Sequence, residues 1–287
     1  MVAKAKVTAA ERRVLRVIEK ATIEIDHAVN TAQMIAFDAM EATGAERLAL
    51  AGKALEASGL CVDAWGILAA EAPEGTALTL SLWRHAVAVG EAMLGPWRME
   101  EYRGDFWSVT ETRPYMRARQ GLAVELRRQG QLPEAIDTLR GTLALNPNDN
   151  QGARYILLDW LLEAGAEAEA AALHAAYAED DSAAWHYAAA LLAFRRSGDG
   201  PEAAAALERA LANNPHVPGL LLGRVPPPAE SPEFYSPGDA DEAAVYLETG
   251  AAGWQAAGAL DWLARAVPGE AAPPPAPSPK PRRKPKG

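Results

Sequence analysis

The sequence predicts an all-α protein built from repeated helix pairs. Two observations carry this prediction. About half of the 287 residues are apolar, with alanine very frequent and only 7% aromatic, and alanine-rich segments with few β-branched runs favour closely packed helices over sheets. In addition, the same pattern of helix start and helix end recurs at a fixed spacing, as it does in helical repeats.

The spacing is clearest in two segments. One helix is expected to open at Gly130–Ile136 and to stop at Asn146-Pro147, and another to open at Gly200–Ala204 and to stop before Pro215. Equivalent residues, such as Glu134 and Glu202, stand 68 positions apart, twice the period of about 34 residues of tetratricopeptide repeats (TPR). Proline directly after the last turn cannot continue a helix, so it marks each end.

The residues inside the repeat fit close helix packing. Ala135 and Ala203 are small enough to let two helices approach, and Gly130 is placed as a C-cap glycine. Ala123 and Leu139 match other packing positions of this repeat class. We therefore predict a right-handed TPR superhelix with a long N-terminal helix, C-terminal capping helices and a disordered basic tail.

The repeat signals also divide the chain. The array is interrupted between its first, weaker unit and the later ones, and a long aromatic-rich loop usually packs on its own scaffold or serves a site. The expected parts are an N-terminal helix (1–43), a degenerate TPR-like unit (44–95), an aromatic insertion loop (96–112), three TPR units (113–216), a C-terminal capping region (217–266) and a disordered proline-rich basic tail (267–287).

The N-terminal helix carries one continuous apolar stripe. Thr8 and Glu11 have capping-box spacing, and the stripe consists of Val14, Ile18, Ala21, Ile25, Ala28, Ala32, Ile35 and Ala39. A helix that caps the first repeat explains this pattern. A homodimer formed through the helix is the alternative interpretation.

Composition limits the partners and the compartment. The net charge of −10 argues against a nucleic-acid-binding main surface, whereas the tail gathers basic residues from Lys280 to Lys286 and could bind nucleic acid or another acidic surface. No stretch predicts a membrane span or a signal peptide, so we expect a cytoplasmic protein. Cys61, the single cysteine, lies in an apolar stretch and is interpreted as a buried structural thiol.

Known catalytic patterns are missing from the sequence. It has no glycine-rich phosphate loop, no His-Glu-x-x-His and no Gly-x-Ser-x-Gly. The five histidines are scattered, and His174 and His186 in alanine-rich helices are better explained as structural residues than as ligands. We therefore predict no enzyme activity, no metal and no cofactor.

Several short motifs occur in an order that resembles a known family. They include Asp63-Ala64-Trp65, Gly104–Trp107, Thr112–Ala118, Asn146–Gly152 and Trp262-Leu263. Over roughly residues 44–265 the chain is similar to the suppression-of-tumorigenicity-seven family of TPR proteins and its bacterial relatives. The resemblance implies an α-helical repeat fold and a binding role without known catalytic activity.

In a TPR array the first helix of each pair lines the concave face. The inward positions of this chain predict a partner-binding groove made of Arg117, Gln120, Val124, Arg127, Arg128, Gln151, Arg154, Leu158, Leu161 and Leu162, with Trp185 nearby. Arginines beside an apolar strip suit an extended peptide that carries carboxylates. Replacing Arg117 or Arg154 is expected to weaken binding and to leave stability unchanged. The alternative for Arg154 is a pair with Asp149 or Glu125 inside the scaffold.

The predicted function is that of a soluble adaptor or scaffold that holds a protein or an extended, acidic peptide in this groove. One alternative is an enzyme, or an enzyme-recruiting subunit, with a site at residues 96–117. Its candidate contacts are Trp97, Tyr102, Phe106, Trp107 and Arg113. The other alternative is binding of nucleic acid or an acidic surface through the basic tail.

Overall fold

The computed structural model describes residues 9–232, 234–255 and 258–269. Within these ranges every regular element is a helix, which confirms the predicted all-α class. The chain forms two compact units, Met1–Leu157 and Leu158–Gly287. Helix α7 (Ala153–Glu163) contains the boundary between them.

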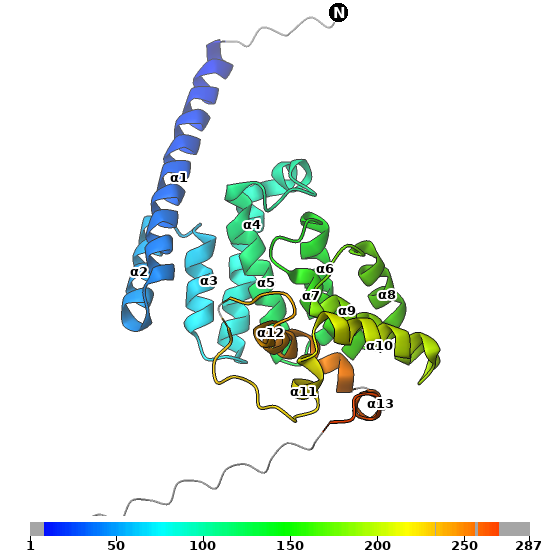
Figure 1. Cartoon of the computed structure of the whole chain (residues 1–287). Helices are drawn as coiled ribbons and strands as arrows, with labels where there is room; N and C mark the ends of the chain where they lie inside the picture. The colour runs from blue at the N-terminus through cyan, green and yellow to red at the C-terminus, as the bar shows by residue number, and fades with distance from the viewer. Residues whose placement is uncertain (1–8, 233, 256–257, 270–287) are drawn as a thin grey trace, which may run out of the picture. The chain divides into compact units, whose positions relative to one another are not determined.

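The first unit consists of helices that follow one another through short turns (Figure 1). They are α1 (Ala9–Glu41), α2 (Gly44–Ala57), α3 (Val62–Glu71), α4 (Ala77–Glu101), the 3₁₀ turn η1 (Thr110–Thr112), α5 (Arg113–Arg128) and α6 (Leu132–Leu145). Consecutive helices from α1 to α5 and the pair α5–α6 pack against each other, and α3 also contacts α5.

Helix α1 packs on the rest of the unit through its C-terminal half. Ala32, Ala36 and Ala39 are fully buried in a core cluster shared with α2 and α3. Ile25, on the same stripe, is 52% exposed, and Figure 1 shows α1 extending beyond α2 on that side. The side chains of Val14, Ile18 and Ala21 lie outside the described part of the structure, so a homodimer through α1 stays a prediction.

Helix α4 continues past residue 95, where the degenerate unit was expected to end. Gly95 adopts φ 62° and ψ 169°, which interrupts the helix, but Pro96 starts a further helical segment that runs to Glu101. Proline is well accommodated in the first turn of a helix because it lacks the N–H that would have no acceptor there. Residues 96–101 of the expected insertion loop are therefore helical.

The packing positions of the repeat are as predicted. Ala123, Ala135 and Leu139 have no exposed surface between α5 and α6. Gly130 has φ 74° and its N–H donates to the carbonyl of Arg127 at the end of α5, in the left-handed conformation that favours glycine. Cys61 is buried, and burial raises the pKa of its thiol, as expected for a structural cysteine.

The second unit continues the helix pairs and then folds back on itself. Its elements after α7 are α8 (Glu167–Ala176), α9 (Ala183–Ser197), α10 (Pro201–Asn213), α11 (Val217–Leu221), α12 (Ala240–Gly250), the 3₁₀ turn η2 (Ala252–Gln255) and α13 (Ala259–Ala266). Helices α12 and α13 both contact α9. Trp254 and Trp262 stack with parallel rings 6.2 Å apart, and Trp262 also stacks on Phe194 of α9.

A buried carboxylate joins three parts of this unit. Glu242 is 5% exposed. Its Oε1 accepts a hydrogen bond from the backbone N–H of Ala183 at 2.9 Å, and its Oε2 accepts from Asn214 Nδ2 at 3.0 Å and from the N–H of Gly238 at 2.7 Å. One side chain thus ties the start of α9, the end of α10 and the turn before α12.

The C-terminal end of the described chain differs slightly from the expected boundary. The last helix, α13, ends at Ala266, the last residue of the expected capping region. The carbonyl of Val267 accepts a hydrogen bond from Arg224 at 2.6 Å, so the first residues assigned to the tail contact the folded unit. Residues 270–287, which hold the basic cluster, lie outside the described residues.

Candidate functional site

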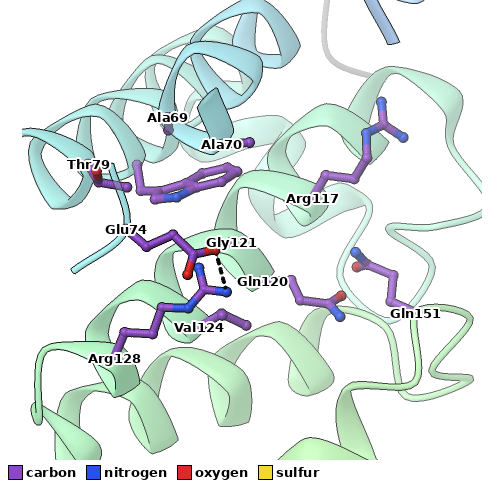
Figure 2. A pocket seen from close by; sticks show the side chains of 11 residues that line it. Ala69, Ala70, Glu74, Thr79, Arg117, Gln120, Gly121, Val124, Arg128 and Gln151 are labelled. Carbon is purple, nitrogen blue, oxygen red and sulfur yellow. Dashed lines mark ion pairs between the residues drawn. The ribbon is translucent and has the colours of Figure 1, made fainter. Parts of the chain in front are cut away.

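A cavity of about 380 Å³ opens in the first unit between α3, α4 and α5 (Figure 2). Residues from these helices, from the turn that joins α3 to α4 and from the turn before α7 form its wall. They are Ala69, Ala70, Glu74, Thr79, Trp83, Arg117, Gln120, Gly121, Val124, Arg128 and Gln151. Five of these residues, Arg117, Gln120, Val124, Arg128 and Gln151, were assigned to the inward face from the repeat register alone.

The indole of Trp83 fits against two glycines. A Cβ atom added to Gly121 of α5 would lie 2.4 Å from Cη2 of Trp83, and one added to Gly66 of α3 would lie 3.3 Å from Cζ3. Because glycine has no side chain, these two positions on α3 and α5 leave room for a large ring from α4. This close approach sets the separation of α3, α4 and α5 and with it the width of the cavity.

This contact predicts opposite effects for two Gly→Ala changes. Gly121→Ala should lower the free energy of unfolding by about 1–3 kcal/mol, because the new methyl group overlaps the Trp83 ring. Gly52→Ala, in the middle of α2 with nothing within 4 Å of the new Cβ, should raise it by about 0.5–1 kcal/mol. Urea unfolding of both variants measures the difference. Equal stabilisation of the two proteins would contradict the placement of Trp83 against Gly121.

An ion pair lies at one side of the cavity. Oε1 of Glu74 is 3.0 Å from Nη2 of Arg128, and the side chains are 68% and 45% exposed; Figure 2 marks this pair. The turn that carries Glu74 is held through its backbone, since Thr79 Oγ1 donates to the carbonyl of Pro73 and Gln129 Nε2 to that of Thr76. An exposed pair of this kind contributes only about 0.2–1 kcal/mol.

Two side-chain amides lie on the other side of Arg128. Gln120 and Gln151 both line the cavity, and Figure 2 shows Gln120 beside Arg128 and Gln151 farther along, below Arg117. The Oε1 atom of Gln151 is buried and accepts no hydrogen bond within the described part of the chain. A primary amide offers both donors and an acceptor, which is the complement of a peptide backbone.

The side chain of Arg117 forms an ion pair with a buried residue of the scaffold. Its Nε is 2.9 Å from Oδ1 of Asp63 and its Nη2 is 2.5 Å from Oδ2, and Gln33 Nε2 donates to the same carboxylate at 2.7 Å. The Asp63 side chain is 3% exposed, whereas that of Arg117 is 36% exposed. Replacing Arg117 should therefore lower stability, in contrast to the expectation from the repeat register, because Asp63 would be left as a buried charge.

Arg154 is also paired, as the alternative interpretation held. Its Nη1 is 3.0 Å from Oδ2 of Asp149 and its Nη2 donates to the hydroxyl of Tyr155 at 2.6 Å. Asp149 also accepts from the backbone N–H of Ala153 and of Arg154 at 2.7 and 2.9 Å, so it caps the start of α7. Burial raises the pKa of Asp149, and these hydrogen bonds oppose the shift. Arg154 therefore stabilises the turn between α6 and α7 by pairing with Asp149.

The apolar part of the predicted groove is buried in the second unit. Leu158, Leu161 and Leu162 are each less than 5% exposed, and Trp185 is 2% exposed. Trp185 stacks on His174 at 5.6 Å between ring centroids and donates from Nε1 to the His174 carbonyl. These four side chains offer a ligand almost no surface. Arg127 is half-buried and is absent from the wall of the cavity described above.

The insertion packs on its own scaffold. The backbone N–H groups of Gly104 and Phe106 both donate to the carbonyl of Leu145, and Phe106 is fully buried. The guanidinium of Arg113 lies 5.4 Å from the ring centroid of Trp107 and donates to its carbonyl. Tyr102 is half-buried, and Trp97 is 66% exposed. A site on this segment stays a prediction.

The sequence reasoning missed Glu74, Thr79, Trp83 and the alanines Ala69 and Ala70. These residues belong to the degenerate first unit, where the repeat register was too weak to assign inward positions. The glycines Gly66 and Gly121, spaced to admit a large ring, were the available signal for Trp83.

Two features of the described ranges bear on function. No helix within residues 9–232, 234–255 and 258–269 is long and apolar enough to cross a bilayer. In the same ranges no three or more His, Cys, Asp or Glu side chains gather as metal ligands would. His186 pairs with Asp181 at 2.7 Å, and His174 packs on Trp185.

The helix pairs α5–α6 and α9–α10, with their buried alanines and boundary prolines, define an all-α helical-repeat protein. The model of the ST7 protein family matches residues 21–267, and the chain belongs to that family. This confirms the resemblance seen in the motifs. No curated protein matches the chain. Among solved structures it is similar to YrrB, described as a TPR protein with an unusual peptide-binding site, with 17% identity, a TM-score of 0.41 and coverage of 69% of this chain and 90% of YrrB.

Proposed function

We propose that this protein is a non-enzymatic adaptor that holds an extended peptide segment of a partner protein in the cavity of the first unit. The observation that carries the proposal is the cavity itself. Its lining combines the apolar side chains of Trp83, Val124 and Ala69 with amides and arginines. Such a mixture of apolar surface and a few placed polar groups is typical of ligand sites.

Binding fits this wall better than catalysis does. Acid–base catalysis commonly uses a histidine or a pair of carboxylates within reach of the substrate. Among the described residues that line the cavity, Glu74 is the one carboxylate and none is a histidine, and Arg117 is held by Asp63. Amides such as those of Gln120 and Gln151, in contrast, pair directly with a peptide backbone.

The test is a selection of binders from a random displayed peptide library on the immobilised full chain. Peptides should be enriched, and Val124→Trp, which fills the cavity from α5, should weaken the binding of the selected peptides at least tenfold, by loss of the apolar contact surface. Met34→Trp, at a 64% exposed position of α1, is the matched control and should bind normally.

Two outcomes would defeat the proposal. Recovery of no enriched peptide would argue against peptide binding as such. Equal affinity of the selected peptides for the parent and for Val124→Trp, with both proteins folded by circular dichroism, would place the binding site elsewhere on the chain.

A further inference from the structure

Helix α5, which forms one side of the cavity, is strongly basic. Helix α5 contains five arginines and one glutamate, a net charge of +4 in a chain whose net charge is −10. Of these arginines, Arg117 and Arg128 line the cavity. Arg117 is bound to the buried Asp63, so Arg128 is the cation whose partner is most easily exchanged.

That partner is a side chain of the protein placed where a ligand group would lie. Glu74 reaches Arg128 from the turn between α3 and α4, and both side chains remain well exposed. The backbone of the turn is held by hydrogen bonds to Pro73 and Thr76. Glu74 can therefore leave Arg128 by rotating its side chain, with no rearrangement of the turn.

We infer that the ligand of this cavity is an acidic extended peptide, and that Glu74 occupies the position of the ligand's carboxylate until the peptide displaces it. This inference rests on the function proposed above and specifies its ligand. A carboxylate of the peptide pairs with Arg128, an adjacent apolar side chain lies on Trp83, and the peptide backbone bonds to Gln120 and Gln151.

The unpartnered acceptor at the wall supports a peptide over a free small anion. Oε1 of Gln151 is buried without a donor in the described structure, and the backbone N–H of an extended peptide is such a donor. An isolated carboxylate has only acceptors at neutral pH and would leave this atom unpaired. An acidic peptide offers both partners: a carboxylate for the guanidinium of Arg128 and a backbone N–H for Oε1 of Gln151.

The experiment uses the same displayed library, panned separately on the parent protein and on Arg128→Gln. Peptides recovered on the parent should be enriched in Asp and Glu, and this enrichment should be lost on Arg128→Gln. One recovered acidic peptide, synthesised with a fluorescent label, then gives dissociation constants by anisotropy. Arg128→Gln should weaken its binding about tenfold, and Glu74→Gln should strengthen it about two- to fivefold because the internal competitor is gone.

Matched controls come from an exposed pair on α6. Arg140 and Asp137 form an ion pair three residues apart on the surface, so Arg140→Gln and Asp137→Asn change the same charges away from the cavity and should leave affinity within about twofold. Weaker binding of the peptide to Glu74→Gln than to the parent would overturn the role of Glu74 as a competitor. Selected peptides that occupy the cavity, as judged by Val124→Trp, but show no acidic enrichment would overturn the ligand class and leave the proposed function standing.

Discussion

Arg117→Ala should lower the free energy of unfolding by about 3 kcal/mol, the lower end of the range for leaving a buried charge without its partner. Asp63, whose side chain is 3% exposed, would keep only the hydrogen bond from Gln33. The lower end applies because Arg117 lines an open cavity, and water can enter where the guanidinium was. Urea unfolding followed by far-ultraviolet circular dichroism measures the loss.

A second substitution separates the lost charge pair from lost packing. Asp63→Asn in the Arg117→Ala background removes the buried charge and keeps an acceptor for Gln33, so it should recover at least half of the loss. Arg140→Ala, which breaks an exposed pair on α6, should change stability by less than about 0.5 kcal/mol. If the Arg117→Ala protein is as stable as the parent, the ion pair between Arg117 and Asp63 does not contribute to the stability of the fold.

Glu242→Ala should destabilise the second unit by about 3 kcal/mol or more. The change removes three hydrogen bonds and leaves the buried N–H of Ala183 without its acceptor. The buried amide of Asn214 loses one of two acceptors and still donates to the carbonyl of Asp239. A buried donor without an acceptor costs about 1–3 kcal/mol. The amide proton of Ala183 should also exchange with solvent much faster than in the parent, because this bond protects the start of α9.

Glu242→Gln tests whether the carboxylate itself is needed. The glutamine oxygen can accept from one donor, but its NH₂ group would face another donor, so an intermediate loss is expected. Glu208→Ala, at an exposed position of α10, is the matched control. Parent-like stability of Glu242→Ala would show that water replaces the carboxylate in these contacts.

The helix boundaries were largely predictable because local residues determine them. The ends of α6 at Leu145 and of α10 at Asn213 follow from prolines that cannot extend a helix. The period of the repeat also identified α5 residues that share one face, and of these Arg117, Gln120, Val124 and Arg128 line the cavity, whereas Arg127 does not. Local signals are sufficient for both inferences.

The partners of those residues were not predictable in the same way. Asp63 lies 54 positions before Arg117, and Glu74 reaches Arg128 from a turn of the degenerate unit. A repeat register states which face a side chain occupies but not which carboxylate stands opposite, because that depends on how closely neighbouring helices approach. Here the approach is set by Trp83 against Gly66 and Gly121.

The burial of Leu162 had a different cause. In an open array an inward leucine of the first helix stays accessible, but here the 3₁₀ turn η2 lies over it. Gly253 is so close that an added Cβ would be 3.0 Å from Cβ of Leu162. That cover comes from the atypical end of the chain, where the repeat pattern has stopped and offers no guidance.

The same cover changes how the second unit should fold. In a simple repeat array each unit touches only its neighbours, so ends can fray and whole repeats can be removed. Here the N–H of Gly253 donates to Asp159, 94 positions earlier, and Arg195 of α9 donates to the carbonyls of both Leu162 and Gly253. The last segment therefore closes a long loop onto the first helix of the unit. Closing this loop raises the contact order of the unit, which slows folding. The same contacts should make the second unit unfold as one cooperative body, so that repeats cannot be removed one at a time from its C-terminal end.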